Sequence, residues 1–399
     1  MQCVILAAGE GRRMRPLTSR RPKVLLPLAN TPMLGHLISA ARIAGIEEIT
    51  LVVGYGEREV RGYFRDGSEF GVSIRYVTQR YQKGTADAVN AARKHIDDTF
   101  LLMNGDMVLQ SGDISGMIAQ HAPCMGIYHS DHPEDYGVVS VEKNHVTCLE
   151  EKSEKLKSTL INAGIYLFDP DILDLFAEVK CSSRGEYELT DALDVYIAQG
   201  LLNAYQLDSW MDVGFPWDLL SANEILLRDL MPGNDGEIEE GVSIHGPVSI
   251  GEGTLVKSGT YIEGPCIIGK NCRIGPHAYI RGHTSIGNDC HIGHCTEIKN
   301  SIIMSNTKIP HFNYLGDSVV GSGCNFGAGT KVANLRHDHR TVKIRGRDTK
   351  RVKMGAIIAD DVKFGINCSV NVGAVLGSNV KVAPHSYVEG WIDEDSQIR

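Results

Sequence analysis

The chain has 399 residues, more than one hydrophobic core usually serves, so we expect at least two domains. Its composition, 42% hydrophobic and 22% charged, is typical of a globular protein and excludes a disordered or fibrous chain. The formal net charge of -9 argues against a general nucleic-acid-binding protein.

The sequence also bears on where the protein acts and on the redox state of its cysteines. A strand-like segment begins at Gln2, so we expect no signal peptide, and no apolar run approaches the ~20 residues that span a bilayer. The ten cysteines form no CxxC pair and no disulfide-rich cluster. These features favour a reduced, cytoplasmic protein that does not act at a membrane.

The first half of the chain alternates strand-like and helix-like segments. Apolar runs predict strands at residues 3–7, 49–53, 100–103 and 165–168. Helical patterns lie between them at residues 33–44, 85–96 and 190–199. This alternation predicts a mostly parallel sheet covered by helices, which is a Rossmann-like α/β fold.

A domain boundary is predicted where this alternation ends. A further helix opens at Pro216 and stops at Pro232, and the stretch MPGNDGE around that proline reads as a linker. We therefore expect one domain over residues 1–231 and a second over residues 232–399.

The second half is dominated by a period of six. A β-branched aliphatic residue recurs at Ile238, Ile244, Ile250, Val256, Ile262, Ile268, Ile274, Ile280, Ile286, Ile292 and Ile298. Small residues stand two places before many of these, at Thr254, Thr260, Cys266, Cys272, Ala278, Thr284, Cys290 and Thr296. Hexapeptide repeats are the signature of a parallel β-helix, so we expect the aliphatic side chains to point inward and the small residues to fit the corners.

The hexapeptide frame slips twice. It is lost after Ile298, resumes at Val320, and slips again between Val332 and Ile358. We interpret both slips as loops expelled from the coil, and such loops are where functional residues collect.

A Gly-rich turn from Gly9 to Gly11 follows the first strand. Glycines let backbone N–H groups approach a phosphate chain, and Arg13 and Lys23 add positive charge nearby in the sequence. The turn is not a P-loop, because no GKS or GKT follows, and it lacks the third glycine of a dinucleotide fingerprint. Taken alone, such a turn is more often an ordinary connection, so the surrounding sequence has to decide.

The surrounding string VILAAGEGRRMRPLTSRRPKVLLPLANTPML resembles the signature of the sugar-1-phosphate nucleotidylyltransferases. Arg12 departs from it, since the family usually has Thr or Ser there. Further matching segments are QRYQKGTADAV, NGD, LEEKS, NAG, EYELTD and WMDVGFPWD. Ser153 replaces the proline that usually follows the Glu-Lys pair of LEEKS.

This resemblance implies transfer of a nucleotidyl group from UTP or dTTP to a sugar-1-phosphate. Arg13 and Lys23 are the implied catalytic residues, and Asp106 and Asp212 the implied Mg²⁺ ligands. Positioning and charge neutralisation dominate such a reaction, and Mg²⁺ prefers one or two carboxylates beside substrate oxygens. The implied nucleotide- and sugar-binding residues are Leu6, Ala7, Ala8, Gly9, Gly11, Gln79, Gly84, Thr85, Gly137, Glu151, Lys152 and Asn162.

The repeats resemble the left-handed β-helix acyltransferases, and above all the archaeal branch of the bifunctional uridylyltransferase/glucosamine-1-phosphate acetyltransferase family. The matching features are Arg281, Lys299, KIPHFNYLGDS, CNFGAGT and Asn334. Leu335 departs from the bacterial pattern, in which tyrosine is usual. The resemblance implies acetyl-CoA as co-substrate and a homotrimer.

The same resemblance assigns roles within the coil. His311 is the implied general base, and histidine suits this role because it exchanges protons near neutral pH. The implied substrate- and coenzyme-binding residues are Arg281, Lys299, Tyr314, Asn325, Ala328 and Asn334. Cys324 reads as a packing residue rather than a nucleophile. The histidines at 277, 283, 291 and 294 read as solvated surface rather than as a metal site.

A basic loop spans residues 335–353. It carries Arg336, Arg340, Lys343, Arg345, Arg347, Lys350, Arg351 and Lys353. Two interpretations stay open: a solvated flap, or a phosphate contact in which Arg340 and Lys343 lie nearest the acceptor or coenzyme A. No aromatic residues interleave with these charges, so nucleic acid is not expected.

Two alternative functions remain. In the first, the chain is a glucose-1-phosphate uridylyl- or thymidylyltransferase whose β-helix is only a scaffold for trimer formation. In the second, it is a regulatory subunit without activity, like the nucleotidylyltransferase-like parts of translation exchange factors. The retained acetyl-transfer residues argue against the first, and the retained Arg, Lys and Asp set against the second. The sequence does not fix UTP over dTTP, nor the sugar.

Overall fold

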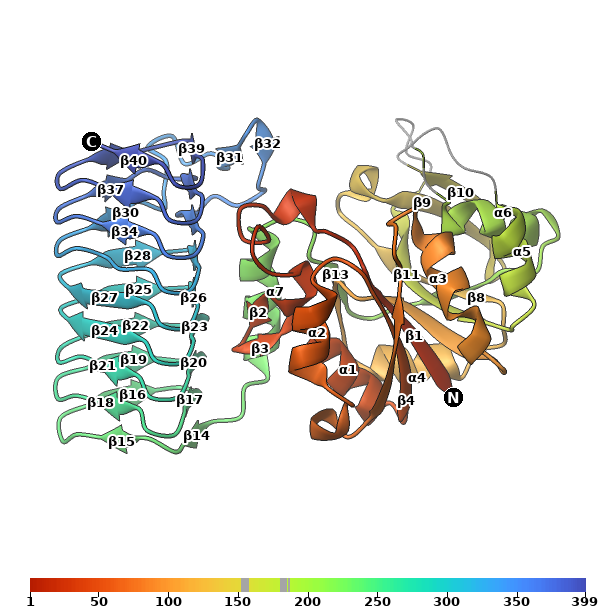
Figure 1. Ribbon diagram of the computed structural model, residues 1–399, viewed down its shortest axis with the longest axis horizontal. Helices are drawn as coiled ribbons and strands as arrows, with labels where there is room; N and C mark the ends of the chain where they lie inside the picture. The colour runs from red at the N-terminus through yellow and green to blue at the C-terminus, as the bar shows by residue number, and fades with distance from the viewer. Residues whose placement is uncertain (152–157, 180–184, 186) are drawn as a thin grey trace. The chain divides into compact units, whose positions relative to one another are not determined.

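The computed structural model describes residues 1–151, 158–179, 185 and 187–399, which form two compact units (Figure 1). The first unit comprises Met1–Glu10, Arg21–Leu25 and Met33–Asp212, and the second Gly11–Arg20, Leu26–Pro32 and Val213–Arg399. Helix α7 (Asp218–Arg228), expected in the first domain, groups by its contacts with the second unit. The domain boundary after residue 231 therefore stays a prediction.

The first unit is built on a nine-stranded sheet in the order β5-β4-β1-β6-β11-β8-β12-β10-β9. The strands are β1 (Gln2–Ala7), β4 (Glu48–Val53), β5 (Ser73–Thr78), β6 (Phe100–Asn104), β8 (Cys124–His129), β9 (Gly137–Glu142), β10 (His145–Glu151), β11 (Leu160–Phe168) and β12 (Asn203–Gln206). Strands β5, β4, β1 and β6 run parallel, as the alternating pattern predicts. Strand β11 departs from this, because it pairs antiparallel with β6 and β8.

Helices cover both faces of this sheet. Along β1, Cys3 and Ile5 enter one hydrophobic core and Val4 enters the other, as the period of two in a strand requires. Helices α1 (Met33–Ile43), α2 (Glu57–Phe64) and α4 (Ser111–Ile118) contribute to the first core. Helices α3 (Thr85–Ala92), α5 (Ile172–Glu178) and α6 (Leu189–Ala198) contribute to the second. The predicted α/β fold is confirmed.

The second unit is a parallel β-helix with three faces (Figure 1). One face holds nine strands from β14 (Gly233–Asn234) to β39 (Trp391–Ile392), and another holds eight from β16 (Ser243–His245) to β38 (Tyr387–Val388). The third runs from β15 (Glu237–Ile238) to β27 (Lys308–His311) and continues from β34 (Lys363–Phe364) to β40 (Gln397–Ile398). Strands that carry candidate residues are β22 (Tyr279–Arg281), β24 (His291–His294), β25 (Glu297–Lys299) and β28 (Tyr314–Gly316).

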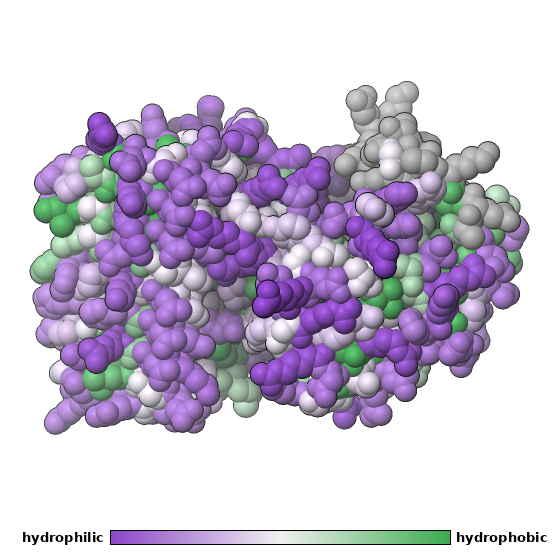
Figure 2. Space-filling model, viewed as in Figure 1, coloured by the Kyte–Doolittle hydropathy of each residue, from purple (hydrophilic) through white to green (hydrophobic). Residues whose placement is uncertain are grey.

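Strand pairing confirms the hexapeptide period. Cys266 lies opposite Val248 and Thr284 lies opposite Cys266, so neighbouring coils are 18 residues apart, which is three hexapeptides. The inward aliphatic residues from Ile250 to Ile298 are buried, as are all the small corner residues. Ile238 and Ile244 are each 37% exposed, because they belong to the first coil and no further coil covers it. The face of the coil seen in Figure 2 is mostly hydrophilic, with small separate hydrophobic patches.

The two frame slips have different causes. At the first, no loop leaves the coil, so that interpretation is wrong: Ile302 lies opposite Ser285 and Val319 opposite Ile302, each 17 residues on rather than 18. Two successive coils are each one residue shorter than the 18-residue coils before them. The second slip is a true excursion, because Ile357 lies opposite Val319, 38 residues on instead of 18, which leaves 20 extra residues. These extra residues include the hairpin of β31 (Lys343–Ile344) and β32 (Arg347–Asp348).

Several surface histidines have a structural role at the corners. His277 (φ 55°) and His283 (φ 63°) adopt the left-handed conformation, as do Asn271 (φ 56°) and Asp289 (φ 58°). Asn, Asp and His tolerate this conformation better than most residues. Within the described parts of the chain, no three His, Cys, Asp or Glu side chains gather as a metal site.

Helix α7 packs on the coil through one buried asparagine. Asn223 Oδ1 accepts hydrogen bonds from the Ala29 N–H (2.8 Å) and the Ser285 hydroxyl (2.7 Å), and Nδ2 donates to the His283 carbonyl (2.9 Å). Asn30, beside Ala29, donates to the coil at the Ile286 carbonyl (2.7 Å). Neither α7 nor any other described helix has the length and apolar character needed to cross a membrane.

Candidate active sites

The two predicted metal ligands come together in the first unit. Asp106 lies in the turn between β6 and β7 (Met107–Leu109), and β13 (Trp210–Asp212) pairs with β7 so that Asp212 lies opposite Met107. The Gly105 N–H donates to the Leu6 carbonyl (2.9 Å), which fixes this turn to the end of β1. A Cβ at Gly105 would lie 2.7 Å from the same oxygen, so only glycine fits.

Lys23 reaches the same turn from the short 3-10 helix η2 (Lys23–Leu25). Its Nζ lies 2.6 Å from Asp106 Oδ2, and its side chain is 8% exposed. A charge-assisted hydrogen bond of this kind is roughly twice as strong as a neutral one. Lys23 and Asp106, with Asp212 on the paired strand beside them, make up a charged cluster, and the roles that the resemblance implies for these residues stay predictions.

This cluster fits a magnesium ion. Mg²⁺ takes oxygen ligands and usually keeps several waters, so one or two protein carboxylates suffice. The Asp106 side chain is 33% exposed and Asp212 is half-buried, so both carboxylates border solvent.

The predicted base-recognition segment lies at the same edge of the sheet. Gln79 directly follows β5, and Ala8 follows β1, so both stand at carboxyl ends of parallel strands, where α/β sheets bind ligands. Gln79 Nε2 donates to the Gly84 carbonyl (3.0 Å) and to Asp87 Oδ2 (2.8 Å), and Gln82 donates to the Ala8 carbonyl (3.2 Å). The segment is therefore held against β1 by its own side chains.

The remaining nucleotide residues are backbone elements of this edge. Leu6 and Ala7 end β1, and Gly9 has open space where a Cβ would stand. Gly84 has φ 113°, and a Cβ there would lie 2.3 Å from the Tyr187 carbonyl oxygen. Thr85 Oγ1 accepts a hydrogen bond from the Leu189 N–H (3.0 Å), which joins α3 to α6.

The predicted sugar-binding residues lie on β9, β10 and β11. Asn162 Oδ1 accepts hydrogen bonds from the Gly164 N–H (3.0 Å) and the Tyr166 hydroxyl (2.9 Å), which fixes its rotamer. Gly137 lies opposite Glu151 in the β9–β10 pair. Lys152, the implied sugar-phosphate ligand, lies outside the described residues.

Two residues of the N-terminal signature group with the second unit. Gly11 (φ 67°) precedes the 3-10 helix η1 (Arg12–Met14), and its carbonyl accepts the Thr18 hydroxyl (2.9 Å). The Arg13 guanidinium lies over the Phe215 ring, 5.1 Å from its centroid.

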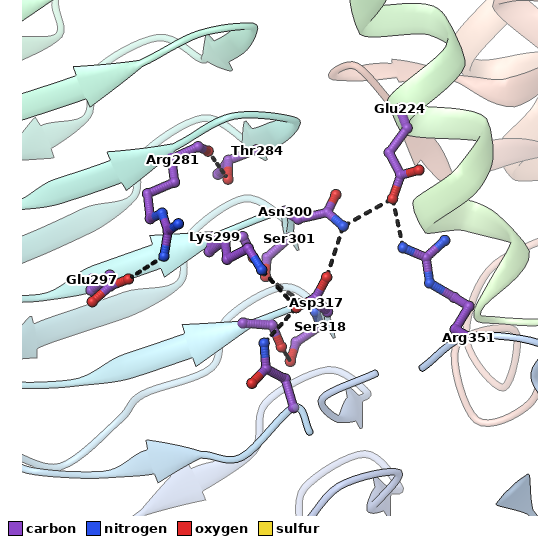
Figure 3. A network of polar contacts seen from close by, with 12 residues as sticks. Glu224, Arg281, Thr284, Glu297, Lys299, Asn300, Ser301, Asp317, Ser318 and Arg351 are labelled. Atoms are coloured by element: carbon purple, nitrogen blue, oxygen red, sulfur yellow. Dashed lines mark hydrogen bonds and ion pairs between the residues drawn. The ribbon is translucent and has the colours of Figure 1, made fainter. Parts of the chain in front are cut away.

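On the coil, polar side chains gather around Asp317 (Figure 3). Arg281 and Lys299 take matching positions on the neighbouring strands β22 and β25, so their side chains share one face. Asp317, 2% exposed, accepts hydrogen bonds from Asn334 Nδ2 (2.5 Å) and Asn300 Nδ2 (2.9 Å), and Lys299 Nζ lies 3.6 Å from its Oδ2. Asp317 therefore orients two implied substrate-binding residues: Lys299, expected at the sugar phosphate, and Asn334, expected at the sugar.

Basic side chains of this cluster lie next to its carboxylates. Burial lowers the pKa of Lys299, Asp317 raises it, and the neighbouring Lys353 ammonium lowers it again. Arg281 pairs with Glu297 (3.0 Å), which holds the guanidinium in place. Both side chains are about one-third exposed. Lys299 and Lys353 side by side create a site suited to a phosphate dianion.

Tyr314 and Asn334 border the same face. Burial raises the pKa of the Tyr314 hydroxyl, and hydrogen bonding to Asn334 opposes this increase. A Cβ at Gly316 would lie 2.5 Å from Asn334 Nδ2 and 2.7 Å from the Tyr314 hydroxyl oxygen. Any side chain at Gly316 would thus displace both.

His311 is the last residue of β27 and is exposed at the corner of the coil that precedes β28. The Gly329 N–H donates to the His311 carbonyl (3.1 Å), and Asn325 bridges to Lys308 on the strand of His311. Asn325 and Ala328 therefore belong to the corner region of His311. The three residues of β28 separate this corner from Asp317 by about 10 Å.

The basic loop meets the cluster through residues other than those expected. Across the described ranges, no contact joins Arg340 or Lys343 to the Asp317 cluster, so their role stays a prediction. Arg351 instead binds Glu224 of α7 (2.6 Å), whose carboxylate also accepts Asn300 (2.9 Å) (Figure 3).

Cys324 packs inside the coil. It is 1% exposed, and burial raises the pKa of its thiol to about 12. Since the thiolate is the nucleophilic form, this supports its interpretation as a packing residue.

We expect Asp317→Asn to raise the KM for an amino-sugar phosphate by about 10- to 100-fold, because a buried charged acceptor contributes about 1.5–3 kcal/mol. The KM for acetyl-CoA and the rate of nucleotidyl transfer should change little. Asp360→Asn is a matched control, since Asp360 accepts the Ser322 N–H (2.7 Å) elsewhere on the coil. Steady-state kinetics are measured with each substrate varied in turn. A raised KM for the amino-sugar phosphate alone indicates that Asp317 positions the ligands, whereas a loss of folding would lower kcat for all substrates alike.

Sequence comparisons find known families in both halves of the chain. Residues 2–229 match the family described as Nucleotidyl transferase, and residues 262–376 match the GMPPB C-terminal domain. The chain is 30% identical to a crystal structure from Bacillus anthracis described as a glucose-1-phosphate thymidylyltransferase, with a TM-score of 0.54. That match covers 59% of this chain and 98% of the other.

Full-length relatives match both halves together. The chain is 45% identical to a Bifunctional protein GlmU of Methanococcus maripaludis and 40% identical to that of Methanocaldococcus jannaschii, over all of this chain and 97% of each relative. It is 37% identical to a bifunctional sugar-1-phosphate nucleotidylyltransferase/acetyltransferase of Sulfurisphaera tokodaii, over 97% of both chains. These matches disfavour both alternatives, the scaffold and the inactive subunit. The chain belongs to the GlmU family and is a bifunctional enzyme, a nucleotidyltransferase joined to an acetyltransferase.

Proposed function

We propose that the first site transfers a nucleotidyl group from UTP or dTTP to a sugar-1-phosphate and releases pyrophosphate. The ion pair of Lys23 and Asp106 beside Asp212 carries this proposal. The two carboxylates would hold Mg²⁺, which when bound supplies positive charge to the phosphates. Lys23 places its ammonium against the α-phosphate as the sugar-phosphate oxygen attacks, and Arg13 keeps its implied role toward pyrophosphate.

We propose that the coil acetylates glucosamine-1-phosphate or galactosamine-1-phosphate with acetyl-CoA. The Asp317-centred cluster supports this, because Arg281, Lys299 and Lys353 suit the sugar phosphate. The amine nitrogen forms a bond to the acetyl carbon as the carbon–sulfur bond breaks. His311 accepts the amine proton, and the departing thiolate leaves as coenzyme A.

We further propose that the protein is a homotrimer of the reduced cytoplasm. Within one chain His311 ends β27 and Asp317 follows β28, so the two residues lie at different corners of the coil. In a trimer, a neighbouring coil would complete a site that needs both. The nine described cysteines are all free thiols, in keeping with a reducing compartment.

A product assay on the full-length protein tests these proposals. Each of UTP and dTTP is offered with four sugar-1-phosphates, and acetyl-CoA with the two amino-sugar phosphates. We expect nucleotide sugar from at least one pair, with Mg²⁺ required, and coenzyme A release with an amino-sugar phosphate. Sedimentation of the same preparation should give a trimer. Coenzyme A release that is absent with both amino-sugar phosphates would contradict the second proposal while leaving the first intact.

A further inference from the structure

A cavity of about 610 Å³ lies within the second unit, away from the acetyl-transfer cluster. It is bordered by the η1 segment, by the residues that precede α7, by the β31–β32 hairpin and by β39. Its volume is within the range of small-molecule sites. None of the residues assigned to the acetyltransferase lines it, whereas Arg13, an implied catalytic residue of nucleotidyl transfer, does.

Aromatic rings form part of the wall. Phe215 and Trp217 stack with parallel planes, 2° apart, at 4.9 Å between ring centroids. The Arg345 guanidinium lies 3.5 Å from the centroid of Trp391, and that of Arg347 lies 4.4 Å from the centroid of Phe215. Paired aromatic and guanidinium planes are the surfaces on which nucleobases stack.

The charge of the wall is strongly positive. Five arginines line the cavity against two acidic residues, which leaves a net +3; the arginines are Arg12, Arg13, Arg15, Arg345 and Arg347, and the acids Asp393 and Glu394. Asp393 also accepts the indole N–H of Trp391 (3.0 Å), which holds that ring in place. Arginine binds phosphate oxygens in bidentate geometry, so the wall favours a polyphosphate.

Arg345 occupies an unusual position for an arginine. It has φ 49° and is followed by Gly346 with φ 79° at the tip of the hairpin, where two-residue turns of this kind prefer Asn-Gly. A bulky side chain in this conformation is disfavoured and is typically retained where it has a function. Here the turn places the guanidinium on Trp391, at the edge of the cavity.

We propose that this cavity binds a nucleoside diphosphate group, with the diphosphate on the arginines and the base against the aromatic rings. Two sources share this chemistry: a nucleoside diphosphate sugar, and the adenosine diphosphate part of coenzyme A. Because Arg13 lines the cavity, occupancy lowers the rate of nucleotidyl transfer; this last step rests on the proposed function.

Titration calorimetry on the full-length protein tests the site, with UDP, ADP and inorganic pyrophosphate as probes. Arg345→Ala should weaken one binding event for a nucleoside diphosphate by about 10- to 100-fold and leave the other events unchanged. Lys350→Ala is the matched control, since Lys350 (φ 59°) lies in the same loop with the same backbone conformation but does not line the cavity. A stronger effect on UDP identifies the nucleotide-sugar source, and a stronger effect on ADP the coenzyme source.

Three results would overturn the proposal. The first is an unchanged affinity for UDP and ADP in Arg345→Ala. The second is an equal loss of affinity in Lys350→Ala. The third is an affinity for pyrophosphate as high as that for either nucleoside diphosphate. Inhibition of nucleotidyl transfer is measured separately. If UDP or ADP binds as expected in a protein without that activity, the proposed function fails and the site stands.

Discussion

Asp106→Asn should lower the rate of nucleotidyl transfer by at least about 10²-fold and leave acetyl transfer unchanged. Asparagine keeps the size of the side chain but cannot neutralise a cation or offer Mg²⁺ a charged ligand. It also removes the carboxylate that lies 2.6 Å from Lys23, so the ammonium loses its partner in a buried position. The measurement is pyrophosphate release from UTP and dTTP across a range of Mg²⁺ concentrations.

The control for this substitution is Asp174→Asn. Asp174 pairs with Arg93 in the same unit, but its side chain is 75% exposed, and exposed pairs contribute little. Thermal melting of both variants shows whether the fold survives. Pyrophosphate release near the unsubstituted rate in Asp106→Asn would remove this residue from the metal site.

His311→Ala should lower coenzyme A release with an amino-sugar phosphate by about 10²–10⁴-fold, the usual loss when a general base is removed. Pyrophosphate release at the other site should not change, because His311 is not among the residues assigned to nucleotidyl transfer and effects at independent sites add. His294→Ala is the matched control, because His294 lies opposite His311 on the neighbouring strand β24.

Two outcomes would contradict the assignment of His311. One is normal acetylation by His311→Ala, and the other is an equal loss in His294→Ala, which would indicate damage to the corner rather than removal of a base. The pH profile of coenzyme A release separates these cases further. Loss of a base removes the inflection on the acidic side, whereas a distorted corner only scales the profile.

The repeating half of the fold was predictable because its period exposes the inward positions directly. Eleven aliphatic residues in one register identify the coil, and nine of them are buried. The sequence alone predicts the cause of the first frame slip wrongly, because Ile302 and Ile303 are both apolar and either could point inward. A coil that is one residue short and a coil with an expelled loop both shift the six-residue register, so the sequence does not distinguish them.

The sites were predictable where a local motif carries them, and not where partners meet from distant segments. Lys23 and Asp106 stand in separate motifs, yet the sheet brings them to 2.6 Å. Nothing in the sequence joins Glu224 of a helix to Arg351 of the basic loop. Asp317 belongs to a matching motif in the sequence, but the motif does not show that its carboxylate is buried and is shared by Asn300, Asn334 and Lys299.

The pairing across the long excursion has a consequence for how the coil tolerates change. Ile357 pairs with Val319 as directly as if the residues between them were absent, and the coils beyond it keep their register. The corner therefore works as a junction at which a segment can be exchanged without altering the stack. Replacing residues 335–353 with the loop of a relative should transplant whatever that loop recognises, while the scaffold beneath it folds as before.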